Sequence, residues 1–455
     1  MPRPFRLTAF AGLCAALGAC PDNAGVPPPA DAFFYPVAAA ASSDGAWLYV
    51  VNSDFDLRYN GGTVVSVDLA AVRAAASQRV VGNGCRVDST AEGVSNALRC
   101  NASRFIRADA TRRIGPFAVD AAVARYTDRE RLYVAVRGDG SVTWFDLDGR
   151  GNMRCGAQGE DGLCDDAHRV GIDPSASPYG NRLPPDPSAL SVDPTRGWVV
   201  VSHQSTDVSY ARATLLYDRG AAAGSPASAG PVLLNVVGGV ATGLSAIALL
   251  PRADASARAT WVATSRNEPV LTYFQAYPGN ATLGDAQPYL YRSATVPLTG
   301  LNLGNNSRAI AVDPTPGASR LYVVSRAPEA LLALDLDRTN PAQVTVSDVI
   351  PLPPGPSRLL ASYDAALGRT LLYVVAFDAR RVSVVDPIER RITAEIPTNR
   401  GPHALVRDPN GQFLYVMDFN DSAMEVVDLR ARTDEGAPNP TYHRRLLTIV
   451  AGGGN

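Results

Sequence analysis

The amino-acid sequence predicts an all-β protein in which one four-stranded antiparallel unit occurs seven times. Aliphatic and aromatic runs recur along the chain, and each is followed, after a polar break, by alternating apolar and polar residues. Such residues favour strands, so each copy is a pair of strands with a short connection. The copies are LYVVNSDFDLRYNGGTVVSVDL (48–69), LYVAVRGDGSVTWFDLD (132–148), WVVVSHQSTDVSYARATLLYD (198–218), WVATSRNEPVLTYF (261–274), LYVVSRAPEALLALDLD (321–337), LYVVAFDARRVSVVDP (372–387) and LYVMDFNDSAMEVVDL (414–429).

Each pair is flanked by two further apolar runs. PSALSVDPTRG (187–197) and PHALVRDPNG (402–411) precede a pair and end in a turn, because Pro presets φ and Gly accepts positive φ. VIPLPPG (349–355) and LLTIV (446–450) follow a pair as a fourth strand. Four antiparallel strands per unit and seven units predict a seven-bladed β-propeller, in which each apolar face is buried against the neighbouring blade. A β-helix or a two-sheet sandwich fits the four-strand period less well.

The repeat also resembles a known family. LYVVN, LYVVS and LYVMD, each followed by alternation that ends in Asp, are similar to the YVTN-type repeats of bacterial surface-layer and periplasmic propellers. Those propellers are related in shape to the lactonase and quinoprotein-like propellers. The resemblance covers about residues 33 to 450 and implies a disc with a polar mouth, without specifying a ligand.

The N-terminus has the features of an export signal. Arg3 and Arg6 precede a short apolar stretch from Leu7 to Leu17, which is too short to span a membrane. The ending Leu17-Gly18-Ala19-Cys20 matches the bacterial lipobox, so we expect lipid attachment at Cys20 and an outer-membrane lipoprotein; an ordinary signal peptide is the alternative. The predicted division is a lipoprotein signal peptide at 1–19, a Pro/Ala-rich tether at 20–32 and the propeller at 33–455.

Four cysteines follow the leader, in the two longest insertions of the early blades. An exported chain lives in an oxidising compartment, so an even number of cysteines in loops indicates disulfides. Of three connectivities we expect the sequential one, Cys85 with Cys100 and Cys155 with Cys164. A four-cysteine zinc site is the alternative, but these spacings match no zinc knuckle.

Composition excludes several classes of function. The net charge of −2 gives no general attraction for nucleic acid. All 42 basic residues are Arg, which excludes Schiff-base chemistry and a P-loop lysine. The sequence contains no G-x-S-x-G nucleophile elbow, no C-x-x-C-H haem attachment and no H-x-H or H-E-x-x-H spacing among its four histidines. No catalytic signature is therefore evident.

One acidic segment is a weak candidate for calcium. Asp146, Asp148 and Asn152 lie among glycines, and further carboxylates occur up to Asp166. A calcium ion takes six to eight oxygen ligands, which clustered carboxylates on a Gly-rich loop supply. The EF-hand spacing is absent, however, and Asp146 ends a strand like the equivalent residues of other copies. A solvated acidic loop is the simpler interpretation, and no other cofactor is expected.

Candidate ligand-binding residues come from the loops that converge on one face of a propeller, around its central channel. Arg308, Arg358 and His403 are expected at equivalent positions just before the innermost strands, where a structural role in bonding the channel wall is the alternative. Nearby acids such as Asp378 give the mouth both charges, and Arg suits a ligand with acidic groups. The predicted mouth residues are His203, Arg266, Arg308, Arg326, Arg358, His403 and Asp418.

Three functions fit this pattern. The favoured one is a noncatalytic, lipid-anchored envelope module that binds a protein or glycan partner, with contact through the membrane anchor and none with nucleic acid. A lactonase-like hydrolase with a site in the central channel is the alternative, and a structural envelope component is the third. We further expect each blade to take four consecutive strands, so that the ring closes by packing of the first and last blades without strand exchange.

Overall fold

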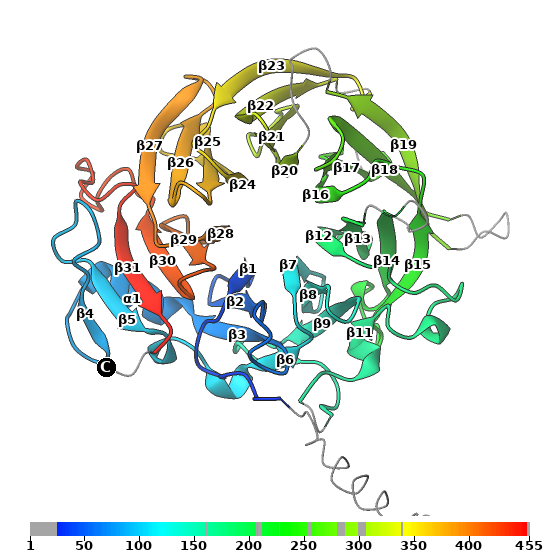
Figure 1. Cartoon of the computed structure of the whole chain (residues 1–455), viewed down its shortest axis with the longest axis horizontal. Coiled ribbons are helices and arrows are strands. Elements are labelled where there is room, and N and C mark those ends of the chain that lie inside the picture. The colour runs from blue at the N-terminus through cyan, green and yellow to red at the C-terminus, as the bar shows by residue number, and fades with distance from the viewer. Residues whose placement is uncertain are drawn as a thin grey trace, which may run out of the picture.

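The computed structural model is a ring of seven antiparallel sheets around a central channel (Figure 1), which confirms the seven-bladed β-propeller. The first strand of each blade faces the channel and the fourth lies at the rim. The structure describes residues 25–452 except 160–161, 206, 208–211, 227, 253–256, 280–286, 299–305 and 338–339.

Blades 3 to 6 each take four consecutive strands, as expected. Their strands are β12 (Pro187–Asp193), β13 (Trp198–His203), β14 (Ala213–Asp218) and β15 (Pro231–Val237) in blade 3; β16 (Leu244–Leu249), β17 (Thr260–Ser265), β18 (Val270–Tyr277) and β19 (Tyr289–Pro297) in blade 4; β20 (Ser307–Val312), β21 (Arg320–Arg326), β22 (Glu329–Leu336) and β23 (Val344–Pro351) in blade 5; and β24 (Pro356–Asp364), β25 (Arg369–Ala376), β26 (Arg381–Asp386) and β27 (Arg391–Pro397) in blade 6.

Blades 1, 2 and 7 carry insertions or additional strands. Their strands are β1 (Pro36–Ala41), β2 (Trp47–Asn52), β3 (Gly62–Asp68) and β6 (Arg112–Ile114) in blade 1; β7 (Ala118–Arg125), β8 (Glu130–Val136), β9 (Ser141–Leu147), β10 (Met153–Arg154) and β11 (Arg169–Val170) in blade 2; and β28 (Pro402–Arg407), β29 (Phe413–Asp418), β30 (Ala423–Asp428), β31 (Arg445–Val450), β5 (Leu98–Asn101) and β4 (Cys85–Val87) in blade 7. The helices are α1 (Leu69–Gln78) and the short 3-10 segments Ala102–Arg104, Ala108–Ala110, Asp166–His168, Pro174–Ala176 and Arg219–Ala221.

The burial of the strands explains the repeated sequence pattern. The second and third strands of a blade are covered on both faces by the neighbouring blades, so β29 and β30 are buried at every position. Strands buried on both faces are continuously apolar, which is the recurring run of the sequence. The fourth strands lie at the rim, and β27 alternates between exposed and covered residues because only one of its faces meets a neighbour.

The ring closes in a way that the sequence analysis did not anticipate. The first and last blades pack side by side through β1 and β28, as expected. Blade 1, however, does not take consecutive strands, because α1, β4 and β5 are inserted between β3 and β6. This insertion crosses to blade 7, where β5 pairs in parallel with β31 and extends that sheet to six strands. The expectation that every blade takes consecutive strands was therefore wrong for blade 1. β1 nevertheless lies in blade 1 and β28 to β31 in blade 7, so no strand is exchanged between the termini, as expected.

The inserted segment is fixed by a disulfide, a helix and polar contacts. Cys85 and Cys100 lie opposite each other on β4 and β5 and form one disulfide, and Cys155–Cys164 forms the other, which confirms the sequential pairing. α1 begins with the Asp68 carboxylate accepting from the Ala71 amide at 3.0 Å. Its buried face joins the core shared by blades 1 and 7.

The residues nearest the chain ends lie close to blade 1. Residues 25–32, which we assigned to the tether, contact it: the Ala30 carbonyl accepts from Thr111 Oγ1 at 2.7 Å, and the Val26 carbonyl accepts from the Asn60 amide. Pro29 and Gly452 line one surface depression, so the two described ends lie near each other, as expected. The predicted signal peptide and Cys20 lie outside the described residues. No helix of the described chain is long and apolar enough to cross a membrane.

Candidate ligand-binding site

A backbone hydrogen bond repeated in every blade builds the channel mouth. The residue just before each innermost strand has a positive φ, as in Tyr35, Asp186 and Gly401, and its carbonyl accepts from the amide that follows the second strand. That amide belongs to a residue whose side chain lines the central cavity. We call these seven residues the mouth ring: Ser53, Arg137, Gln204, Arg266, Arg326, Phe377 and Phe419.

A β-bulge repeated in every innermost strand supplies a second ring. The first and third residues of each strand pair with adjacent residues of the second strand, which leaves the second residue unpaired. A bulge changes the direction of the extra side chain, and here it lines the cavity. We call these residues the bulge ring: Val37, Val119, Ser188, Ser245, Arg308, Ser357 and His403.

The bulge ring corrects one sequence-based expectation. Arg308 and His403 are equivalent, as expected, but the equivalent residue of blade 6 is Ser357, and Arg358 is one position further along. Five blades carry Ala at the position of Arg358, and blade 2 carries Asp120. A one-residue difference in register at a bulge is invisible in a sequence pattern. The alanines at this position are Ala38, Ala189, Ala246, Ala309 and Ala404.

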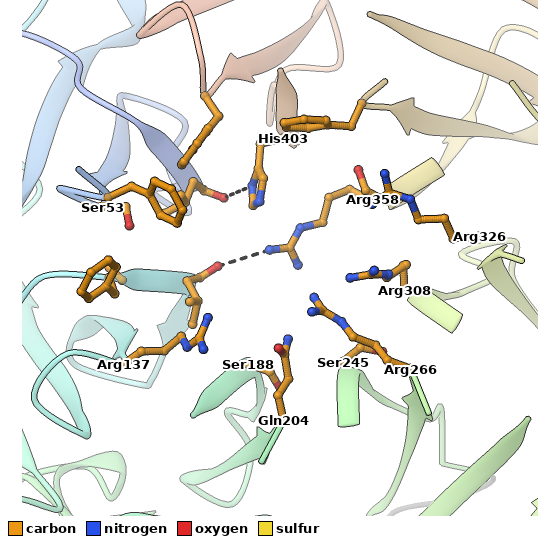
Figure 2. A pocket seen from close by; sticks show the side chains of 18 residues that line it. Ser53, Arg137, Ser188, Gln204, Ser245, Arg266, Arg308, Arg326, Arg358 and His403 are labelled. Atoms are coloured by element: carbon orange, nitrogen blue, oxygen red, sulfur yellow. Dashed lines mark hydrogen bonds between the residues drawn. The ribbon is translucent and has the colours of Figure 1, made fainter. Parts of the chain in front are cut away.

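Five arginines converge on a cavity of about 340 Å³ at the centre of the ring. Figure 2 shows Arg266, Arg308 and Arg326 on one side, opposite Ser53, with Arg137 nearer to blade 2 and Arg358 reaching across the middle. Four of the five were expected at the mouth from sequence. A cavity of this size is typical of a small-molecule site, and guanidinium groups bind carboxylate and phosphate in bidentate fashion.

Two of these arginines have carboxylate partners. Arg137 pairs with Asp186 at 2.8 Å, and Arg326 pairs with Asp378. Within the described part of the chain, neither Arg266 nor Arg308 has an ion pair or a side-chain hydrogen bond, and the buried Nε atom of each has no acceptor. A buried donor without an acceptor is costly, and an anion in contact with these guanidinium groups would offset part of that cost.

The arginines also oppose one another's charge. Burial lowers the pKa of Arg266 to about 9, and the charges of Arg308, Arg358, Arg137 and Arg326 contribute in the same direction. Burial likewise lowers the pKa of Arg308, with further lowering by Arg326 and Arg358. The cavity is therefore strongly electropositive, whereas the chain as a whole carries a formal charge of −2.

Arg358 extends across the channel (Figure 2). Its Nη2 donates to the carbonyl of Val119, on the opposite side in blade 2, at 3.3 Å. It also acts on Asp120: burial raises the pKa of that carboxyl, and the Arg358 charge opposes the rise. The Asp120 carboxylate accepts from the Leu190 amide of blade 3 at 2.8 Å, so it links blades 2 and 3.

His403 is a neutral member of the same wall. Its Nδ1 lies 2.8 Å from the carbonyl of Val37, so Nδ1 carries the proton and donates, and Nε2 is left as an acceptor. Burial, together with the nearby Arg358 charge, lowers the pKa of His403 to about 3. The imidazole is thus uncharged at neutral pH and is a weak base.

Four phenylalanines form an aromatic part of the wall. Phe55, Phe117, Phe377 and Phe419 line the cavity, and Phe55 is 58% exposed. The ring centroid of Phe55 is 5.3 Å from that of Phe419 and 6.1 Å from that of Phe117, both edge to face. Four of the arginines come from blades 4 to 6, which we call the arginine side, and Phe55, Phe117 and Phe419 come from blades 1, 2 and 7, which we call the phenylalanine side. Arg137 of blade 2 and Phe377 of blade 6 lie outside this division.

His203 does not line this cavity, contrary to expectation. It is the last residue of β13, so its side chain points into the blade while that of the next residue, Gln204, faces the cavity. His203 is fully buried, with Nε2 2.9 Å from Thr214 Oγ1 and Nδ1 3.2 Å from the Pro185 carbonyl. Burial lowers its pKa to about 4, so it is a neutral structural side chain.

Asp418 has the same place in blade 7 and is also turned away from the cavity. It is fully buried at the end of β29 and accepts from Asn399 Nδ2 at 3.2 Å. Burial raises its pKa well above the usual value, and the nearby Glu425 carboxylate raises it further. Arg445 pairs with Glu425 at 2.5 Å and donates to the Thr90 carbonyl at 2.6 Å. Asp418 thus belongs to the buried network that joins blade 7 to the inserted segment.

The acidic loop of blade 2 uses its described carboxylates internally. Asp146 pairs with Arg131 at 2.7 Å, and Asp148 accepts from Asn152 Nδ2 at 2.7 Å. Asp165 lies 2.5 Å from His168 Nδ1. No cluster of three or more metal-ligating side chains is present among the described residues, which do not include Glu160 and Asp161.

Sequence analysis missed Arg137 and the phenylalanine side. A signal was nevertheless available, because the mouth ring directly follows the recurring second strand. Aligning the copies LYVVN, LYVAV, LYVVS, LYVVA and LYVMD on their last residue places Ser53, Arg137, Arg326, Phe377 and Phe419 in one column. The residues in that column are arginines in some blades and phenylalanines in others, and this difference makes the lining of the cavity asymmetric.

Comparisons with known proteins support the fold. No family model and no curated protein matches the sequence. Among solved structures, hydrazine synthase from Kuenenia stuttgartiensis is similar with a TM-score of 0.53 and 13% identity, covering 87% of this chain and 96% of that one. A putative 6-phosphogluconolactonase from Bacteroides uniformis is similar with a TM-score of 0.49 and 14% identity, covering 83% and 87%. At such identities the likeness concerns the fold alone.

Proposed function

We propose that this protein is an exported, lipid-anchored β-propeller of the bacterial cell envelope that binds an anionic ligand in its central cavity. The observation that carries the proposal is the group of five arginines, of which Arg266 and Arg308 lack any described acidic partner. A fold gains nothing from gathering like charges in a cavity. An anion that bridges the two guanidiniums supplies the missing acceptors and relieves their repulsion.

Two observations support the cellular location. Both disulfides indicate an oxidising compartment outside the cytoplasm. The lipobox at Cys20 adds the anchor, and the first described residues lie along blade 1, so the disc is expected close to the membrane surface. Cys20→Ala is expected to release the protein from membranes into the soluble fraction, and an unchanged membrane association would contradict the anchor.

Calorimetric titration with inorganic phosphate tests the binding site. The paired variant Arg266→Gln with Arg308→Gln should weaken binding by about 10-fold or more, because a hydrogen bond to a charged group contributes about 1.5–3 kcal/mol. Arg391→Gln is the matched control, since Arg391 is an exposed arginine on the rim strand β27. Wild-type affinity should fall as salt rises. Equal affinity in the wild type and the paired variant would reject the site.

A hydrolase is the second candidate, because His403 lines the same cavity as five arginines that can polarise a carbonyl. The pKa of about 3 opposes it, since a general base works best when its pKa is near the working pH. Turnover of a panel of simple lactones, lost in His403→Ala, would favour the hydrolase. Binding of the same compounds without turnover would favour the binding module.

A further inference from the structure

The phenylalanine side of the cavity limits the chemistry of the ligand. Phe55 is 58% exposed although it lies next to three other aromatic rings, Tyr35, Phe117 and Phe419. Aromatic side chains contribute most when their faces are covered, so an exposed ring within a cavity is a surface available for contact. Small-molecule sites typically combine such apolar walls with a few placed polar groups.

The two sides of the cavity lie opposite each other. Arg266 and Arg308 come from blades 4 and 5, and Figure 2 shows them across the cavity from Ser53 of blade 1, with Arg358 of blade 6 reaching into the space between. Phe55 follows Ser53 in the same loop, and its contacts with Phe419 and Phe117 extend the aromatic surface to blades 7 and 2. A bare inorganic ion bound at the arginines leaves this surface uncovered.

We infer that the ligand is an amphiphilic anion, with a carboxylate or phosphate head on an aromatic or aliphatic body. This inference rests on the proposed anion site. The head binds at Arg266 and Arg308, whose buried Nε donors have no acceptor within the described part of the chain. The body lies against Phe55 and Phe419, where burial of apolar surface adds affinity. A cavity of about 340 Å³ accommodates a head group together with a body of about one ring.

Matched ligand pairs test the inference by calorimetric titration. The pairs are phenyl phosphate against methyl phosphate and benzoate against acetate, which keep the head and change only the body. The aromatic member of each pair should bind about 10-fold more tightly, as expected for one well-covered ring. Equal affinities within both pairs would overturn the inference and leave the anion site standing. No binding of any of the four would overturn both.

The phenylalanine side is tested separately by Phe55→Ser. Phe55 is exposed, so its replacement should not disturb folding. The variant should bring the ratio of phenyl phosphate to methyl phosphate affinity close to one. Tyr179→Ser is the matched control, because Tyr179 is an aromatic of equal exposure, 58%, outside the cavity. A ratio that persists in Phe55→Ser would reject the assignment of the body to this wall.

Discussion

The guanidinium of Arg358 in blade 6 donates to the Val119 carbonyl in blade 2, at 3.3 Å. This bond joins opposite sides of the ring, whereas Ser245 bonds to the adjacent blade, at the Ser307 carbonyl, over 2.6 Å. Of the Arg358 guanidinium nitrogens, only Nη2 has an acceptor among the described residues, so the other donors are available to an anion held at Arg266 and Arg308. Arg358 is therefore expected to close the channel on one side and to contact the ligand on the other.

Arg358→Met should weaken binding of phenyl phosphate by about 10-fold, because it removes a charged donor from the cavity. Arg358→Lys should bind with intermediate affinity, since it keeps the charge and loses the bidentate geometry. Titration at several salt concentrations provides the measurement, and the methionine variant should show the weaker salt dependence. Unchanged affinity in Arg358→Met would mean that the bond to Val119 is purely structural.

Arg266→Met should stabilise the protein while it impairs binding. The pKa of Arg266 is about 9 in the folded state, below the usual 12.5, so protonation is disfavoured by folding. At neutral pH Arg266 is charged in both the folded and the unfolded state, so the full electrostatic cost of its burial reduces the stability of the folded state. This cost is relieved only as pH rises from 9 towards 12.5, where the folded state loses the proton first. Replacing the charge should raise Tm by about 1–3 °C in a chain of this length.

Thermal unfolding at pH 7 tests this, with Arg391→Met as the control for loss of an exposed charge. Inorganic phosphate should raise the Tm of the wild type and not that of Arg266→Met, because a ligand stabilises only the state that binds it. A lower Tm in Arg266→Met would show that packing of the arginine stem outweighs the electrostatic relief.

The repeated strand pattern was sufficient to predict seven blades and both disulfides, because each blade is defined by local alternation and each cysteine pair closes a short loop. The cavity was predicted only in part. His203 and Asp418 end their strands with side chains turned into the blade, and the residues that follow them, Gln204 and Phe419, face the ligand site. Successive side chains at the end of a strand point in opposite directions, and the sequence pattern does not reveal which of the two faces the cavity.

The sequence also did not predict which blade the inserted segment joins. Residues 85–101 read as a loop of blade 1, but β5 pairs with β31, more than three hundred residues later in the chain. The residues of β5 do not themselves specify β31 as the pairing partner. The pairing is favoured by the free edge of β31 and by Arg445, which bonds both Glu425 within blade 7 and Thr90 in the insertion.

His203 should make the folded state less stable in acid and should not affect ligand binding. Its pKa is about 4 when folded and 6.5 when unfolded, so the unfolded state binds more protons between these values and stability falls as pH drops through this range. Between pH 7 and pH 5 the wild type should lose about 2 kcal/mol more than His203→Gln. Urea unfolding at both pH values provides the measurement. Phenyl phosphate affinity at pH 7 should be unchanged, whereas a marked loss would imply a link to the cavity.

The Cys85–Cys100 disulfide should control the closure of the ring. Removing it with paired serine substitutions should cost about 3 kcal/mol on the chain-entropy model, given the sequence separation of 15 residues. Because β5 covers the edge of β31, the loss should also speed hydrogen exchange at Leu447–Val450. The paired serine variant of Cys155 and Cys164 is the control, since that bridge lies in the loop of blade 2 and should leave β31 protected. Equal protection of β31 in both variants would show that blades 1 and 7 hold the ring closed without the inserted hairpin.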